Sequence, residues 1–172
     1  RIEAYSNLQR YDGLKYGYST SRTPKDMYDL YYKSRGEAFG YQAKLRLMTG
    51  VWASQDKFYE KYYRRAQRAR AMMRRDYDQA FDPNGKYRLD AMLTPSTPTP
   101  AFELGGETSG NPILMQFADQ FTAPMNFSGT PGISFPAGIS QSGLPIGLQA
   151  AGYDYCESKI LRVAYAFEQA TK

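Results

Sequence analysis

The side chains that most often perform enzyme chemistry are scarce in this chain of 172 residues, which contains no histidine and a single cysteine, Cys156. Without histidine, neither a Ser-His-Asp nor a Cys-His arrangement can form. A zinc site would have to use carboxylates and one thiolate, which is an uncommon ligand set. The sequence therefore excludes the histidine-dependent hydrolases, and a serine nucleophile would need an activating group other than histidine.

Serine-containing segments offer weak candidates for that nucleophile. The stretch Gly-Gly-Glu-Thr-Ser-Gly at 105–110 imitates a nucleophile loop, but it follows a proline-rich segment rather than a strand and has no lysine nearby. We interpret it as a surface loop. Ser134, Ser140 and Ser142 have no identifiable base, and a serine hydroxyl without a base is a poor nucleophile. We therefore interpret them as strand and turn residues and expect no catalytic residue in this chain.

The composition is typical of a globular protein, with 42% hydrophobic and 23% charged residues. The net charge of +5 allows an anionic partner without requiring one. No apolar run approaches the roughly 18 to 20 residues of a membrane span, and the first residues lack the pattern of a signal peptide. One cysteine permits no internal disulfide, which fits a reducing compartment. The expected location is the cytoplasm or an organelle matrix, with no membrane contact.

Helices are predicted to dominate the first half of the chain. Residues 23–26, Thr-Pro-Lys-Asp, have the cap, proline and acid of a helix start. This helix is expected to break between residues 36 and 40 and to resume as far as Gly50. The longest periodic segment, from about residue 51 to residue 81, predicts one amphipathic helix, and strong turn residues follow at 82–85.

Short apolar strands are predicted in the second half. Residues 90–94 form one apolar run closed by proline, and two more runs framed by Gly and Pro lie within 132–149, joined by a tight turn. A loop is expected over 95–111, a short helix over 112–120, and a terminal helix from about residue 157. The pattern predicts an α/β fold with a mixed, largely buried sheet covered by helices. Three strands make a thin sheet for this length, which indicates a missing portion.

Six segments along nearly the whole chain carry a resemblance to a known family. They are SNLQRYDG at 6–13, EAFG at 37–40, LTPSTPTPAF at 93–102, GTPGISFPAG at 129–138, GLPIGLQAAG at 143–152 and LRVAYAFEQAT at 161–171. With these segments in this order, the chain resembles the amidase-signature family, and within it the A subunits of glutamyl-tRNA(Gln)/aspartyl-tRNA(Asn) amidotransferases.

The resemblance implies that the catalytic residues of the family are not in this chain. Amidase-signature enzymes use a serine nucleophile activated through a second serine and a lysine, a set consistent with the absence of histidine. The family carries that set in the N-terminal part that residues 1–172 do not match. The implied fold is the C-terminal part of a single amidase-signature domain, mainly helical over 1–81, with strands, loops and a terminal helix over 82–172. This part alone is expected to be inactive.

The resemblance also implies a substrate-binding pair, Arg46 and Asp119. In the family, an arginine after a Gly-Phe-Gly element binds the α-carboxylate of glutamine, and an acid before a Thr-x-Pro-x-Asn element binds its α-ammonium group. Residues 40–46 and 119–126 match these elements, although Leu45 stands where the family often has a second basic residue. A guanidinium suits a carboxylate because it donates two parallel hydrogen bonds. Such a pair would hold the amino-acid end and present the amide for attack.

Eight basic residues lie close together between positions 57 and 75. They are Lys57, Lys61, Arg64, Arg65, Arg68, Arg70, Arg74 and Arg75. Tyrosines are interleaved with them, and basic residues among aromatics can bind RNA. Because the aromatics follow the stripe expected to face the core, we interpret the cations as a solvated helix face and keep RNA binding as an alternative.

The function implied by the resemblance belongs to a larger protein. That protein would hydrolyse glutamine and deliver ammonia to amidate Glu-tRNA(Gln) or Asp-tRNA(Asn). The implied partners are glutamine, the missing N-terminal part, the B and C subunits and, indirectly, tRNA. No cofactor or metal is expected on this chain, and ATP and Mg²⁺ are expected on one of the partner subunits.

Two alternatives remain open. The chain could be the C-terminal part of a general amidase for small amides, although an apolar amide would give Arg46 and Asp119 nothing to bind. It could also be a non-enzymatic module that holds RNA or a partner surface through its basic residues.

Overall fold

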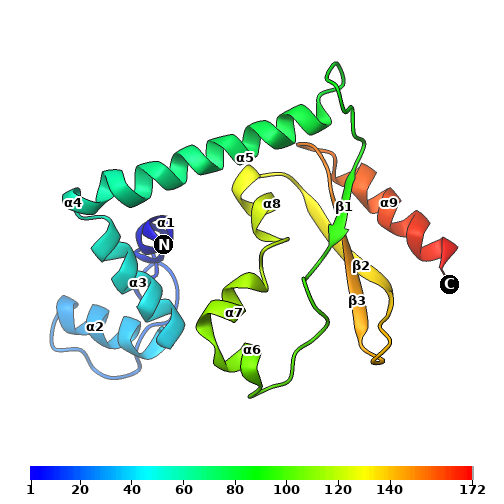
Figure 1. Cartoon of the computed structure of the whole chain (residues 1–172). Helices are drawn as coiled ribbons and strands as arrows, with labels where there is room; N and C mark the ends of the chain where they lie inside the picture. The colour runs from blue at the N-terminus through cyan, green and yellow to red at the C-terminus, as the bar shows by residue number, and fades with distance from the viewer. Residues whose placement is uncertain (172) are drawn as a thin grey trace. The chain divides into compact units, whose positions relative to one another are not determined.

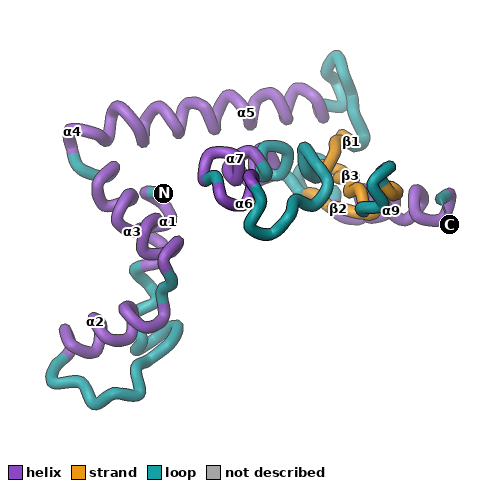
Figure 2. The backbone as a smooth tube through the Cα atoms, turned by 60° about the horizontal axis from the view of Figure 1, so that its bottom comes forward, coloured by secondary structure: helices purple, strands orange, loops and turns teal. Residues whose placement is uncertain are grey.

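The computed structural model describes residues 1–171, which divide into two compact units, Arg1–Arg68 and Ala69–Lys172 (Figure 1). The first unit is helical, and the strands of the described residues gather in the second (Figure 2). No helix within residues 1–171 is long and apolar enough to cross a membrane.

The first unit is built around α1 (Ile2–Leu8), α2 (Met27–Ala38) and α3 (Tyr41–Ala53). Helix α1, which the sequence does not predict, packs against α3 at the buried Gly50. A Cβ at this position would lie 2.5 Å from both the carbonyl oxygen of Arg1 and the Cβ of Tyr5. Glycine is therefore required for the two helices to approach this closely.

Helix α2 begins at Met27, so the predicted start at Thr23 is wrong. The carboxylate of Asp26 accepts a hydrogen bond from the backbone N–H of Asp29 at 2.8 Å, and the carboxylate of Asp29 accepts one from the N–H of Lys25 at 2.9 Å. This reciprocal arrangement satisfies two otherwise free donors and fixes Asp26 as the cap. The predicted interruption before α3 is confirmed, since the backbone is extended at Phe39 and Gly40.

The predicted single helix over 51–81 is interrupted. Helix α3 ends at Ala53, and the chain continues as α4 (Asp56–Phe58), the π-helical η1 (Tyr59–Arg64) and α5 (Arg65–Phe81). The break comes at Gln55, whose backbone is extended. Across it the Trp52 and Phe58 rings pack with centroids 4.1 Å apart. This tertiary contact stabilises a bend that the periodicity does not reveal.

The second unit contains a three-stranded sheet of β1 (Met92–Pro95), β2 (Gly132–Ile139) and β3 (Pro145–Ala151) in the order β1-β3-β2. All three predicted strands are present, and the α/β class is confirmed. The sequence predicts a mixed sheet, whereas β3 pairs antiparallel with both neighbours. The predicted tight turn joins β2 to β3, with the Ser140 N–H donating to the Leu144 carbonyl at 2.8 Å.

Helix α9 (Glu157–Ala170) covers one face of the sheet. Phe135 and Ala150 on the strands pack against Ile160, which is 2% exposed, and against Ala164. Fully burying a side chain such as phenylalanine or isoleucine stabilises a fold by about 1.5–3 kcal/mol. This contact therefore forms the core of the second unit.

Three short helices connect β1 to β2. They are α6 (Glu107–Gly110), α7 (Pro112–Phe117) and α8 (Ala123–Ser128). Helix α7 is confirmed, although it is shorter than predicted, and the Asn111 side chain caps it by accepting from the N–H of Ile113 at 2.9 Å. Helix α6 lies within the predicted loop, and α8 is not predicted from the sequence.

Candidate functional site

The face of the sheet opposite α9 carries a row of polar side chains. Thr94, Gln149 and Ser134 are paired across the three strands. Because side chains alternate along a strand, these three lie on the face that Phe135 and Ala150 do not occupy. Gln149 is only 3% exposed, so its amide needs partners within the protein.

The Gln149 side chain joins this face of the sheet to the segment that precedes α8. Its Nε2 donates to the Thr94 hydroxyl at 2.8 Å and to the Phe121 carbonyl at 2.7 Å. Both donors of the amide are thereby used. This buried side chain helps to hold residues 119–126, which include a predicted site residue, on the sheet, and Met125 packs against Gly132 of β2 in addition.

A pair of serine hydroxyls lies beside Gln149. Ser96 and Ser134 are joined by an Oγ–Oγ hydrogen bond of 2.6 Å, and a Cβ at Gly147 would come within 2.9 Å of the Ser96 Oγ. Within residues 1–171, no titratable side chain forms a hydrogen bond to either hydroxyl. Ser140 and Ser142 form a similar pair, 2.9 Å apart, in the turn after β2. Ser134 thus lies in β2 and Ser140 and Ser142 in the following turn, and the absence of a catalytic role for them stays a prediction.

Asp119 lies in the turn between α7 and α8. Its carbonyl accepts from the backbone N–H groups of Thr122 at 3.1 Å and Ala123 at 2.9 Å, which fixes its backbone. The Asn126 side chain donates to the Thr122 carbonyl at 3.0 Å and closes the same turn. The Asp119 carboxylate is exposed and has no hydrogen-bond or ion-pair partner among the residues that the structure describes.

Arg46 lies in the middle of α3, and its guanidinium is exposed. It has no ion-pair partner within the described part of the chain. Arg46 belongs to the first unit and Asp119 to the second. Both side chains are available to a ligand, and their pairing around one substrate stays a prediction.

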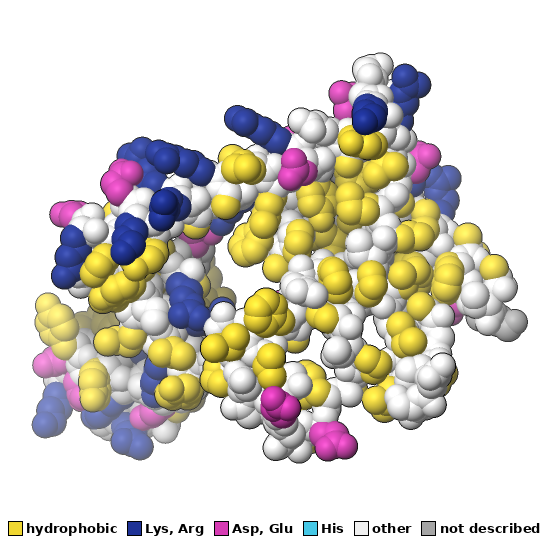
Figure 3. Space-filling view, in the orientation of Figure 1, with side chains coloured by type: hydrophobic (Ala, Val, Ile, Leu, Met, Phe, Trp, Pro, Cys, Tyr) yellow, Lys and Arg dark blue, Asp and Glu magenta, His cyan; other side chains and the backbone are white. Residues whose placement is uncertain are grey.

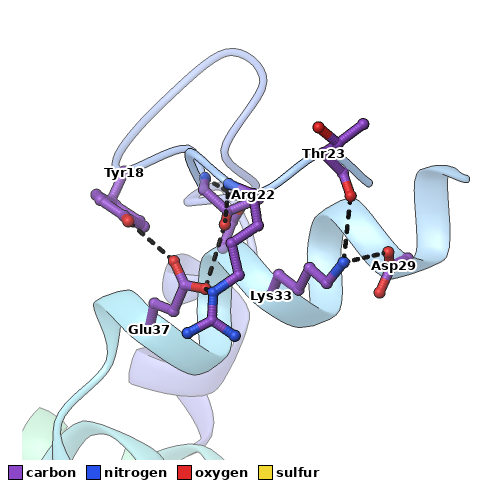
Figure 4. Close-up of polar contacts among 8 residues, drawn as sticks. Tyr18, Arg22, Thr23, Asp29, Lys33 and Glu37 are labelled. Carbon is purple, nitrogen blue, oxygen red and sulfur yellow. Dashed lines mark hydrogen bonds and ion pairs between the residues drawn. The ribbon is translucent and has the colours of Figure 1, made fainter. Parts of the chain in front are cut away.

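In the first unit, a polar cluster that the sequence analysis does not identify holds the loop before α2 (Figure 4). The Glu37 carboxylate accepts from the Tyr18 hydroxyl at 2.9 Å and the Thr20 hydroxyl at 3.2 Å, and it forms an ion pair with Arg22 at 3.2 Å. The hydrogen bond from Tyr18 is the main cause of the lowered pKa of Glu37. The cluster attaches the loop to α2 and has no feature of a catalytic site.

A second part of that cluster involves Lys33 (Figure 4). Its ammonium donates to the Asp29 carboxylate at 2.7 Å and to the Thr23 carbonyl at 3.3 Å. The hydrogen bond from Lys33 is the main cause of the lowered pKa of Asp29. These contacts again attach the loop to α2.

Arg74 is a structural residue of the second unit. Its guanidinium binds the Asp154 carboxylate through two hydrogen bonds of 2.9 and 2.7 Å, and it also binds Asp78 at 2.9 Å and the Ser128 carbonyl at 3.0 Å. Its hydrogen bonds are the main cause of the lowered pKa of Asp154. The interpretation of all eight basic residues as a solvated face is therefore wrong at Arg74, which links α5 to the last residue of α8 and to the loop between β3 and α9.

The described residues contain no group of three or more His, Cys, Asp or Glu side chains that could hold a metal ion. Taken separately, the first unit offers an exposed cation on α3, and the second unit offers an exposed carboxylate in a turn that is attached to a polar sheet face.

Comparisons with known proteins agree with the fold. A family model described as Amidase matches residues 2–161. The chain is 47% identical to the A subunit of glutamyl-tRNA(Gln) amidotransferase from Geotalea daltonii, in an alignment covering 98% of this chain and 33% of the relative. The corresponding subunit of Geobacter metallireducens is 45% identical with the same coverage. The chain thus spans about a third of the length of these relatives.

A solved structure of the same kind of subunit, from Thermotoga maritima, matches with a TM-score of 0.60 and 26% identity. The match covers 97% of this chain and 37% of that one.

Proposed function

Because the chain belongs to the amidase family, we propose that it is the C-terminal part of the glutamine-hydrolysing A subunit of a tRNA-dependent amidotransferase. The parent protein would release ammonia from glutamine to amidate Glu-tRNA(Gln) or Asp-tRNA(Asn). The observation that carries this proposal is the 47% identity, over 98% of the chain, to the A subunit of a glutamyl-tRNA(Gln) amidotransferase.

In this proposal the chain supplies the residues that recognise the amino-acid end of glutamine. Arg46 binds the α-carboxylate and Asp119 binds the α-ammonium group, while the lysine and serines come from the part of the protein that this chain lacks. Both side chains are exposed and have no hydrogen-bond or ion-pair partner among residues 1–171, which supports these roles. The B and C subunits, with ATP and Mg²⁺, would carry out the transfer to tRNA.

The test uses the complete A subunit, assembled with its partner subunits. Arg46→Ala and Asp119→Ala should each lower kcat/KM for glutamine by about 10- to 160-fold, because a hydrogen bond to a charged group contributes about 1.5–3 kcal/mol. Gln42→Ala, on the same helix as Arg46, and Gln120→Ala, next to Asp119, are matched controls at exposed positions and should change kcat/KM less than twofold.

A second substrate separates charge recognition from damage to the fold. A small amide without α-charges should be hydrolysed equally by the wild type and by both alanine variants. A change of less than twofold in glutamine turnover would contradict the assigned roles and favour a general amidase. The isolated chain should have no glutaminase activity, and substantial hydrolysis by residues 1–172 alone would contradict the assignment of the catalytic residues to the absent part.

A further inference from the structure

Positive charge is concentrated in the first unit. Residues 1–68 contain fourteen Lys and Arg against seven Asp and Glu, whereas residues 69–172 contain eight against ten. The first unit therefore carries a net charge of +7 and the second a net charge of −2. Five of the cations lie on α4, η1 and the first turn of α5, and we call them the basic patch: Lys57, Lys61, Arg64, Arg65 and Arg68.

The basic patch occupies the outer side of its helix. All five side chains are exposed, whereas Tyr63 and Gln67 between them are partly buried. The Gln67 amide donates to Glu3 on α1 at 3.0 Å, which identifies the inner side. Lys57, Lys61, Arg64 and Arg68 follow one another at steps of four, three and four residues, and Arg65 lies next to Arg64. Figure 3 shows dark-blue side chains gathered over this part of the molecule.

The charges of the basic patch are largely unneutralised. Arg64 pairs with Glu60 at 3.1 Å, but both side chains are more than half exposed, and such a pair contributes little. Within residues 1–171, the other four cations form no ion pair. A row of uncompensated cations raises the local concentration of anionic ligands and accelerates their binding. The surface is therefore suited to a polyanion.

Aromatic rings lie directly beside the basic patch. Trp52, Phe58 and Tyr62 form a cluster in which the Trp52–Tyr62 centroids are 5.5 Å apart. Lys57 lies 4.8 Å from the Phe58 ring centroid, and Lys61 lies 5.4 Å from that of Tyr62. Trp52 is 46% exposed and Tyr62 is 42% exposed. An acidic protein would use only the cations, whereas a nucleic acid can also stack its bases on the exposed rings.

We propose that the basic patch binds RNA directly, with Lys57, Lys61, Arg64, Arg65 and Arg68 contacting phosphates and Trp52 and Tyr62 stacking against unpaired bases. This goes beyond the proposed function, in which partner subunits handle tRNA. The choice of RNA over DNA rests on that proposed function, while the binding of a single-stranded nucleic acid rests on the surface itself.

The experiment measures binding of the full 172-residue chain to a labelled 20-nucleotide oligo(U) and to a tRNA transcript, by fluorescence anisotropy between about 50 and 200 mM salt. If five phosphates are contacted, log K for oligo(U) should fall with log salt with a slope of about −3.5. The triple variant Arg64→Gln, Arg65→Gln, Arg68→Gln should reduce the magnitude of that slope by about 2.

A matched control carries the same change in net charge. Lys15→Gln, Lys86→Gln and Arg162→Gln replace three exposed cations outside the basic patch and should leave the slope unchanged. Circular dichroism of both triple variants checks that they fold. Trp52 is the only tryptophan, so oligo(U) should quench the intrinsic tryptophan fluorescence when a base stacks on it.

Three results would overturn the proposal. They are the absence of binding at about 50 mM salt, an equal loss in both triple variants, and competition by polyglutamate as effective as that by RNA of equal charge. The last result would identify an acidic protein as the partner. The RNA-binding assay involves no glutamine, and Arg46→Ala and Asp119→Ala should bind RNA like the wild type. Failure of RNA binding is therefore distinguishable from failure of the proposed function.

Discussion

Replacing Gln149 by leucine should destabilise the second unit, although the two side chains are similar in size. Leucine has a similar volume, but it removes the hydrogen bonds to Thr94 and Phe121. Each lost neutral hydrogen bond costs about 0.5–1.5 kcal/mol, and a buried carbonyl left without a donor costs about 1–3 kcal/mol. The Phe121 carbonyl is only partly buried, so water can replace part of its lost hydrogen bond, and the free energy of unfolding should fall by about 1–3 kcal/mol.

Urea denaturation followed by far-UV circular dichroism gives the free energy, and amide hydrogen exchange gives its location. In Gln149→Leu, protection should fall in β3 and in the turn of residues 119–123, because the variant releases that turn from the sheet. Gln141→Leu, at an exposed position in the turn after β2, is the matched control and should change the free energy by less than about 0.5 kcal/mol.

A double-mutant cycle with Thr94→Val checks the reasoning. If the Gln149 amide and the Thr94 hydroxyl stabilise one another, the double variant should be less destabilised than the sum of the single variants, by about 0.5–1.5 kcal/mol. Equal losses in Gln149→Leu and Gln141→Leu, or strict additivity with Thr94→Val, would refute the account of this face.

Two further predictions concern other contacts. The hydrogen bonds from Arg74 lower the pKa of Asp154, so the ion pair stabilises the fold above the unfolded pKa of about 3.9, and this stability is lost as the pH falls through the lower folded value. Urea titrations between about pH 6 and about pH 2 should show a smaller loss in Asp154→Asn than in the wild type, because other carboxyl groups with a lowered pKa, such as Asp29 and Glu37, still titrate in the variant. Gly50→Ala should destabilise the first unit by about 1–3 kcal/mol, because its Cβ would press on Arg1 and Tyr5, whereas Gly36→Ala, in open space on α2, should be neutral or stabilising. Trp52 fluorescence reports both glycine variants from within the same unit, and similar unfolding midpoints for the two would contradict the packing argument.

The strands of the second unit are predictable because their signals are local. Short apolar runs with Gly or Pro at each boundary cannot continue as helices, so β2, β3 and their turn follow from the sequence. Pro136 is tolerated inside β2 because β2 is an edge strand and is irregular there, with a register shift between Pro136 and Gly138. The antiparallel pairing of β2 with β3 follows from the tight turn that joins them, so the expectation of a mixed sheet overlooked that signal. The pairing of β1 with β3 is not predictable in this way, because it joins segments that are distant in the sequence.

The helices that the sequence misses depend on contacts rather than on caps. Helix α1 has seven residues and no side-chain cap, and it is stabilised by packing against α3 at Gly50. Helix α8 has six residues, likewise without a side-chain cap. The interruption at Gln55 depends on the ring packing of Trp52 with Phe58. None of these contacts is visible in a local sequence pattern.

The residues of the candidate site also differ in whether a local sequence pattern reveals them. Arg46 and Asp119 are found from motifs that span a few residues, and their joint role stays a prediction. Gln149 is missed because its partners, Thr94 and Phe121, are 55 and 28 residues away and are brought together only by the strand register. The sequence did offer one signal for Gln149, because a glutamine inside an apolar strand is expected to be buried, and a buried amide must find hydrogen-bond partners.

The cations between residues 57 and 75 have different roles, and the role of each depends on whether a carboxylate of the folded chain pairs with it. Arg74 is neutralised by Asp154 and Asp78, which makes it a clamp rather than a binding surface. Arg65 and Arg74 both lie on α5, and their nine-residue separation places them on opposite sides of that helix. Salt screens the exposed cations of the basic patch more strongly than a partly buried bidentate pair. Salt dependence is therefore the property by which binding through the basic patch can be distinguished from the stabilising role of Arg74.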